Sequence, residues 1–136
     1  MKDLKNTKLP PSTLTDVGLS MFVDVIKLRE LPLPIMEIEL EKLLWHFDMP
    51  VWEKDDTDDW NLTPWEVIKK GVGSINHQKR TEKADTNFPI VVTEYNSRLV
   101  ILDGVHRLVK TYLNNETVIK AKVIPTEYLT KKEYQS

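Results

Sequence analysis

The chain has 136 residues, of which 40% are hydrophobic and 29% charged, as expected of one soluble globular domain. Its 19 Lys and Arg residues against 21 Asp and Glu residues give a formal net charge of −2. This balance excludes a globally basic nucleic-acid coat but allows a local basic patch. The sequence has no cysteine, which excludes disulfides, thiolate nucleophiles and cysteine-ligated metals. With no recognisable signal peptide or apolar membrane span, we expect a cytoplasmic protein without a membrane partner.

The first half of the chain predicts helices around one strand. Residues 1–11 are polar and end in two prolines, so we expect a flexible arm followed by a single domain over residues 12–136. Apolar residues at helical spacing predict one helix from Ser12 or Thr13 to about Arg29. The alternating residues 35–40 predict a strand, and residues 47–52 a loop or short strand.

The middle of the chain carries two further helix signals. Thr63-Pro64-Trp65-Glu66 is typical of a helix start, with a capping threonine, a proline in the first position and a glutamate that reaches back. This helix is expected to end near Gly71. The polar residues 74–85 predict another short helix.

The second half predicts a hairpin, a helix and a closing strand. The apolar runs 88–94 and 99–102 are joined by turn residues 95–98. A helix with a complete apolar stripe begins directly after Asp103-Gly104. Residues 117–124 predict another strand, and a short helix opens after Pro125. The fold expected is therefore a compact α+β domain with a small mixed sheet flanked by helices.

The start of the helix after Gly104 is the main candidate site. Its apolar stripe turns Val105 inward, which leaves His106, Arg107 and Lys110 on the open side. Cationic side chains in a first turn oppose the helix dipole, so they point to an anion bound there by backbone amides, Arg and His. In the alternative interpretation, Asp103 only caps the helix and Arg107 pairs with a surface carboxylate.

Residues 99–110 resemble the signature of the ParB/sulfiredoxin-like superfamily, in which a strand leads through a Gly-x-[His/Arg]-Arg turn into a helix. The predicted strands before and after it also match the family's order of elements over residues 33–125. The resemblance implies a ParB/sulfiredoxin-like fold with a nucleotide site. Gly104, Val105 and the amides after them would hold phosphate, and His106 and Arg107 would contact its oxygens.

Where the sequence departs from that signature, it narrows the range of activities that the resemblance implies. Sulfiredoxins carry their catalytic cysteine where this chain has Val105, so reduction of cysteine sulfinate is excluded. DNA-partition proteins continue into a helix-turn-helix domain, for which this chain is too short. Free-serine kinases of the superfamily look closer, because they also have Asp-Gly before the His-Arg pair. The resemblance then implies a catalytic role for Asp103 and His106, with Asp103 as a base or as a holder of Mg²⁺.

Other residues could extend such a site. Glu37 and Glu39 share one face of the first predicted strand, and the superfamily kinases use an early glutamate as a base; a solvated strand face is the alternative. His77 and Arg80 would share one helix face and, with Lys79 and Lys83, add to a phosphate-binding surface. The alternative for these four is an ordinary basic helix facing water.

Three further features favour structural roles. The acidic residues 53–59 lack the glycine and the final glutamate of an EF-hand and are interpreted as a solvated loop. His46 has no companion at ligand spacing, so a transition-metal site is not expected. Four tryptophans could stack a base, but their spacing favours the anchoring of a long loop; they are Trp45, Trp52, Trp60 and Trp65.

Two functions follow as expectations. The first is an enzyme that binds a nucleoside diphosphate or triphosphate with Mg²⁺ and hydrolyses it or transfers a phosphoryl group. The alternative is a nucleic-acid-binding module or small nuclease that uses the same turn for a backbone phosphate. Its basic residues would be Lys69, Lys70, Lys79, Arg80 and Lys83. A protein-interaction domain that has lost the chemistry is a third interpretation.

Overall fold

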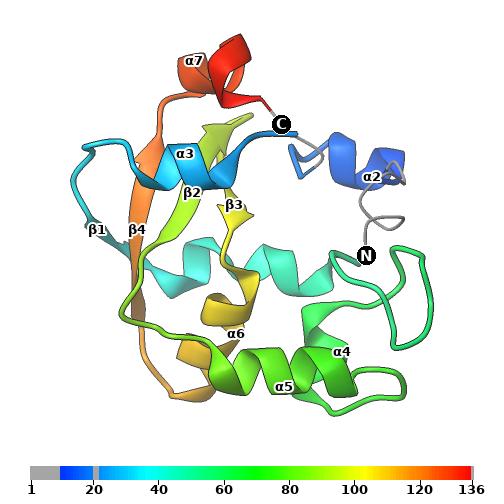
Figure 1. Cartoon of the computed structure of the whole chain (residues 1–136). Coiled ribbons are helices and arrows are strands. Elements are labelled where there is room, and N and C mark those ends of the chain that lie inside the picture. The colour runs from blue at the N-terminus through cyan, green and yellow to red at the C-terminus, as the bar shows by residue number, and fades with distance from the viewer. Residues whose placement is uncertain (1–9, 20–21, 136) are drawn as a thin grey trace.

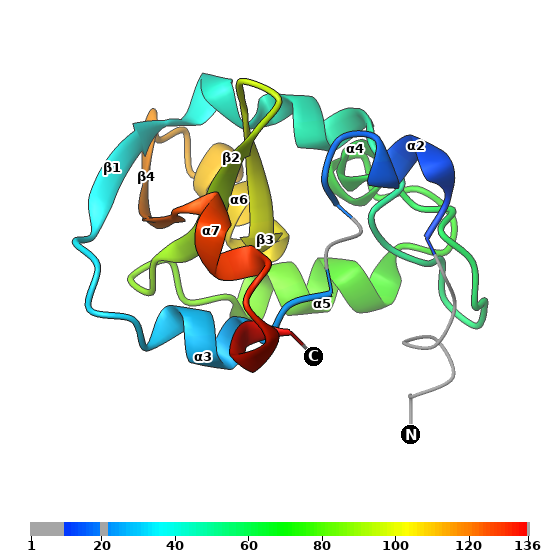
Figure 2. The same cartoon turned by 90° about the horizontal axis from the view of Figure 1, so that it is seen from above.

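A four-stranded mixed sheet organises the computed structural model, which describes residues 10–19 and 22–135. The strands lie in the order β1-β4-β2-β3, seen from left to right in Figure 2. β1 and β3, at the edges, run antiparallel to their neighbours, whereas the central β4 and β2 run parallel. The strands are β1 (Met36–Glu39), β2 (Ile90–Tyr95), β3 (Arg98–Asp103) and β4 (Val118–Ile124). The expected α+β class is confirmed.

The helix expected over residues 12–29 is wrong. The structure has two short helices there, α2 (Ser12–Thr15) and α3 (Val25–Arg29). Between them Gly18 has a φ of +88°, and a Cβ on it would lie 2.9 Å from the Tyr95 ring. A left-handed residue packed against a ring cannot continue a helix. Met21, counted in the expected stripe, lies outside the described residues, as does most of the expected arm.

The segment after β1 forms short 3₁₀ and α-helices. η1 (Leu40–Lys42) and η2 (Leu44–Asp48) cover what was expected to be strand end and loop. The expected helix start at Thr63 is confirmed: α4 (Pro64–Ile68) has a complete capping box between Thr63 and Glu66. The helix expected within residues 74–85 is α5 (Ile75–Lys83).

The second half agrees with the sequence pattern. β2 and β3 form a hairpin whose two turn residues, Asn96 and Ser97, have φ of +52° and +63°, as a tight primed turn requires. α6 (Val105–Leu113) follows and returns the chain to β4. α7 (Thr126–Leu129) and η3 (Lys132–Tyr134) complete the described chain.

Apolar side chains cover both faces of the sheet. On β2, Ile90 and Val92 join a large core with α4, α6 and the 3₁₀ helices, whereas Val91 joins a smaller core under α3 and α7. Figure 1 shows α3 and α7 toward the top of the view and α4, α5 and α6 toward the bottom. Because β2 is buried on both faces, its run of consecutive apolar residues is explained. None of the described helices has the length and apolarity to cross a bilayer.

Candidate active site

The turn between β3 and α6 is held in place by the core beneath it. Gly104 is the N-cap of α6, with φ +121° and ψ +21°. A Cβ at this position would lie 2.8 Å from Cβ of Ile90, closer still to Ile90 Cγ2, and 3.1 Å from Nη1 of Arg107. Only glycine fits both the backbone conformation and the space. The neighbour that leaves no room for a side chain at Gly104 is Ile90 of β2.

Asp103 does not cap the helix. α6 has no side-chain cap hydrogen bond, so the interpretation of Asp103 as an N-cap is wrong. Its Oδ2 instead lies 3.7 Å from Nη1 of Arg107 and 3.8 Å from Nε of Arg29 in α3. The expectation that Arg107 pairs with a nearby carboxylate is therefore met by Asp103 itself.

Two buried polar atoms of this ion pair lack hydrogen bonds. Nη1 of Arg107 and Oδ2 of Asp103 are buried, and within the described part of the chain neither has a hydrogen-bond partner. Their 3.7 Å separation is within ion-pair range but too long for a hydrogen bond. Buried polar atoms are almost always satisfied, so these two atoms, held only by their mutual charge attraction, are a structural anomaly.

A cleft of about 420 Å³ opens beside this turn. α5 contributes Arg80 and Lys83 to its wall, and the β3–α6 turn contributes His106 and Arg107. The full lining is Arg80, Lys83, Ala84, Asp85, Phe88, Asp103, Gly104, His106 and Arg107. The structure thus brings together the expected turn residues and the expected basic face of α5.

Two histidines meet at the edge of the cleft. Nδ1 of His77, in α5, lies 2.9 Å from Nε2 of His106, in α6. Both rings stack on Trp52, with centroid distances of 4.6 Å and 4.3 Å and interplanar angles of 11° and 13°. His77 is buried. Neither the pairing nor the platform could be read from the sequence, because the three residues are separated by 25 and 29 positions with no repeating pattern.

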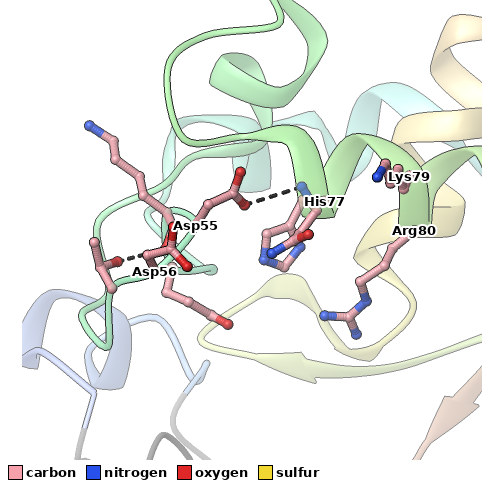
Figure 3. A pocket seen from close by; sticks show the side chains of 9 residues that line it. Asp55, Asp56, His77, Lys79 and Arg80 are labelled. Atoms are coloured by element: carbon pink, nitrogen blue, oxygen red, sulfur yellow. Dashed lines mark hydrogen bonds between the residues drawn. The ribbon is translucent and has the colours of Figure 1, made fainter.

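A second cavity of about 350 Å³, lined in part by His77, lies between α5 and the acidic loop (Figure 3). Asp55 accepts hydrogen bonds from the backbone amides of Ile75 and Asn76 at 3.1 Å each, so it caps α5 from twenty residues away. Within residues 53–59, which were expected to form a solvated loop, Asp55 therefore has a structural role. Glu53, Lys54, Asp56, Lys79 and Arg80 also line this cavity.

Other residues expected at the site lie elsewhere. Nζ of Lys110 donates to the carbonyls of Glu82 and Ala84 and so closes the C-terminal end of α5. Glu37 and Glu39 are exposed on β1, which is separated from β3 by two strands. At the usual strand spacing that is roughly 14 Å. Lys69 and Lys70, just after α4, do not belong to the cleft lining.

The third histidine is part of the core. His46 is fully buried, its Nδ1 donates to the Leu43 carbonyl at 2.8 Å, and its Nε2 accepts from the Ile101 amide at 3.0 Å. Burial lowers the pKa of His46 to about 4. The imidazole is therefore neutral at pH 7 and ties η2 to β3.

Trp45, Trp52 and Trp65 make ring contacts inside the domain. Trp65 packs edge-on against Phe47 and Tyr112, and Trp45 stacks on His46 beneath the guanidinium of Arg98. These contacts agree with the anchoring role expected from the sequence. Trp52 is likewise buried in the larger core, and its indole face also carries the histidine pair.

The magnesium role expected of Asp103 stays a prediction. Its carboxylate faces the guanidinium groups of Arg29 and Arg107, and both repel a divalent cation. Among residues 10–19 and 22–135, no three His, Asp or Glu side chains gather as metal ligands. A metal held by this carboxylate does not fit these neighbours.

Comparison of the chain with protein-family models, with curated proteins and with solved structures finds no match. The resemblance of residues 99–110 to the ParB/sulfiredoxin-like superfamily therefore stays a prediction.

Proposed function

We propose that the cleft beside the β3–α6 turn binds the phosphate groups of a nucleotide and supports hydrolysis or transfer of a phosphoryl group. One observation carries the proposal: three cationic side chains, Arg80, Lys83 and Arg107, line a single cleft beside the start of α6. Phosphate oxygens in this cleft would be neutralised by these three groups. Guanidinium groups suit phosphate because their N–H groups are arranged to bind two oxygens at once.

The charges around the cleft support an anionic ligand. Arg80, Lys83 and Arg107 line it, against the carboxylates of Asp85 and Asp103. Asp103 is already placed between two guanidinium groups, where it orients Arg107. The backbone amides at the start of α6 add partial positive charge at the same end of the cleft.

An aromatic side chain supports a nucleotide over a simpler phosphate. Phe88 lines the cleft and is 61% exposed. An exposed ring beside a cationic cleft is a surface on which a nucleobase can stack, and such stacking tolerates any base. The base of a nucleotide would lie on Phe88 while its phosphates reach Arg107.

Phosphoryl transfer requires few chemical steps from the protein's own side chains. Phosphoryl transfer depends mainly on positioning and on neutralising the charge of the phosphate oxygens. Arg107, Arg80 and Lys83 would supply charge, and His106 would hold or donate a proton. Mg²⁺, when it arrives bound to a nucleotide, would neutralise further phosphate charge. The resemblance of residues 99–110 to the ParB/sulfiredoxin-like superfamily also supports this function.

The test has two stages. A thermal-shift panel of nucleoside diphosphates and triphosphates, with and without Mg²⁺, first identifies the ligand, because saturation at a hundred times Kd adds about 2.7 kcal/mol to stability. Calorimetry then compares Arg107→Gln with the matched variant Arg98→Gln, whose guanidinium stacks on Trp45 outside the cleft. We expect at least about a tenfold weaker affinity for Arg107→Gln only.

Two results would count against the proposal. The first is an unchanged nucleotide affinity in a folded Arg107→Gln protein. The second is preferential binding of a single-stranded oligonucleotide, with an affinity that falls steeply as salt is raised, which would favour the nucleic-acid module. The local charges favour the nucleotide, because Lys79 and Arg80 line the second cavity together with Glu53, Asp55 and Asp56.

A further inference from the structure

The two imidazoles of His77 and His106 lie edge to edge in nearly one plane. Their ring planes differ by 7° and their centroids are 5.1 Å apart. With a nitrogen–nitrogen distance of 2.9 Å, a face-to-face stack is excluded, since it would not place two ring nitrogens in hydrogen-bond geometry. Both rings stack on Trp52, and at this separation they must share the same face of the indole.

This geometry determines where protons can lie. A neutral imidazole has one N–H, and an N–H···N bond needs a hydrogen on one of the two facing nitrogens only. A neutral pair satisfies this in two ways, which differ in the nitrogen that donates. A pair with one added proton keeps the bond and gains a charge. A second added proton would place two N–H groups against each other and break the bond.

The donor in this bond also determines the tautomer of His106. When His77 donates to Nε2 of His106, a neutral His106 carries its hydrogen on Nδ1. When His106 donates to His77, its hydrogen is on Nε2.

We propose that His77 is a positioning residue that shares one proton with His106 through this bond, so that binding of an anion in the cleft is accompanied by uptake of a proton. The anion-binding half of this inference rests on the proposed function. The added proton goes onto the pair, the N–H···N bond is retained, and the positive charge that the pair gains attracts the anion in the cleft. Release of that proton returns the pair to its neutral form.

The charged surroundings of the pair favour a single added proton. On the cleft side stand Arg80, Lys83 and Arg107, with the carboxylates of Asp85 and Asp103. On the side of the second cavity stand Lys54, Lys79 and Arg80, with Glu53, Asp55 and Asp56. These groups are mixed in sign, so an anion in the cleft would shift the balance toward a protonated pair, and cations on both sides oppose a second proton.

The first experiment examines the pair without any ligand. Long-range proton–nitrogen NMR spectra of the ¹⁵N-histidine-labelled protein identify which ring nitrogens carry hydrogens, and a scalar coupling across N–H···N reports the bond. We expect one facing nitrogen to be protonated, the other bare, and the two to be coupled. Two protonated facing nitrogens at neutral pH, or no coupling, would overturn the shared proton whatever the cleft binds.

The second experiment measures sulfate binding against pH, because sulfate remains a dianion across the range and adds no titration of its own. In the unmodified protein, the affinity should rise as the pH falls, by up to about tenfold per pH unit where one proton is taken up. His77→Asn keeps a hydrogen-bonding group near the position of Nδ1 but cannot share a charge. We expect the midpoint of the rise to move about one unit lower in this variant.

Controls separate positioning from mere structure. His77→Ala should move the midpoint at least as far as His77→Asn, and His46→Gln, which changes the core histidine, should leave it in place. A purely structural role for His77 would weaken sulfate binding equally at every pH with an unmoved midpoint, which would overturn the proposal. Absence of sulfate and nucleotide binding, with the NMR coupling present, would instead reject the proposed function and the anion linkage together.

Discussion

His46 shows how completely a small set of neighbours can fix one side chain. Its two ring nitrogens bond a carbonyl of one segment and an amide of another, and Trp45 covers its face. The bonds require one tautomer, with the hydrogen on Nδ1. A protonated ring would place an N–H against the Ile101 amide, so the native state accepts a proton only at the cost of that contact.

The stability of the protein should therefore depend on pH through His46. Its pKa is about 4 in the folded protein against 6.5 for the ordinary side chain. Below pH 6.5 the unfolded chain binds a proton that the native state refuses, so stability falls as the pH drops from 6.5 toward 4. The loss from this group approaches about 3 kcal/mol, measurable by urea unfolding at a series of pH values.

The matched variant is His46→Gln, whose amide oxygen can accept from Ile101 but does not titrate. Its stability at pH 7 should be lower, and its decline between pH 6.5 and 4 should be shallower than that of the unmodified protein. Equal slopes for the two proteins would show that His46 is not the residue that resists protonation.

Sequence reasoning at the level of single residues located the turn but not its partners. Gly104, His106 and Arg107 do line one cleft, together with Arg80 and Lys83 of the basic helix face. The contacts of Asp103 with Arg29 and of Lys110 with the end of α5 were not predictable, because these partners lie 74 and 26 or more residues away along the chain. A pattern within one element has no information about which element packs beside it.

α5 is an element whose start depends on a distant residue. Its own N-cap, Ser74, makes no side-chain cap bond to the helix. Asp55 replaces it with two hydrogen bonds from the acidic loop, and the Asp55 amide in turn donates to the Gly73 carbonyl at 2.8 Å. The negative charge at the helix start also suits the helix dipole.

Removing this cap should loosen α5. Asp55→Ala should cost about 1 kcal/mol of unfolding free energy and speed hydrogen exchange at the first amides of the helix, including His77. Asp48→Ala, which removes an exposed carboxylate from η2, provides a charge-matched comparison and should change neither. If hydrogen exchange at the amides of Ile75 and Asn76 stayed slow in the Asp55→Ala variant, Asp55 would not be the cap of α5.

The elements themselves were predictable where local signals agree. The capping box at Thr63, the alternation of the hairpin strands and the stripe of α6 all gave the observed element. The prediction of one N-terminal helix failed because the apolar spacing continues through Gly18. In the structure, the Tyr95 ring occupies the space that a side chain at position 18 would need. The break is a tertiary contact, and helical periodicity does not register it.

At the level of the whole molecule, two cores on opposite faces share one strand. The smaller core is formed by Leu28, Val91, Ile124 and Leu129. The chain segments that cover it are tied together, since the Asp24 amide donates to the Tyr134 carbonyl and Val23 bridges to Gln135. Stability therefore depends on α3 and the C-terminal segment as well as on the larger core.

Opening a cavity in the smaller core should destabilise the whole domain. Leu28 is fully buried, so Leu28→Ala should lower the free energy of unfolding by about 2–5 kcal/mol. Leu113, which is 50% exposed on α6, gives the matched variant Leu113→Ala with a change below about 1 kcal/mol. Chemical denaturation measures both. Similar losses for the two leucines would mean that the smaller core contributes little.

The contact between Gly104 and Ile90 has a consequence for the time course of binding. Ile90 of β2 is fully buried in the larger core, and the turn that carries Arg107 rests directly on it. The floor of the cleft cannot shift without repacking the centre of the domain, so it has its final shape before any ligand arrives. Little chain entropy remains to be lost at that wall, and association should be a single step whose rate rises in proportion to ligand concentration.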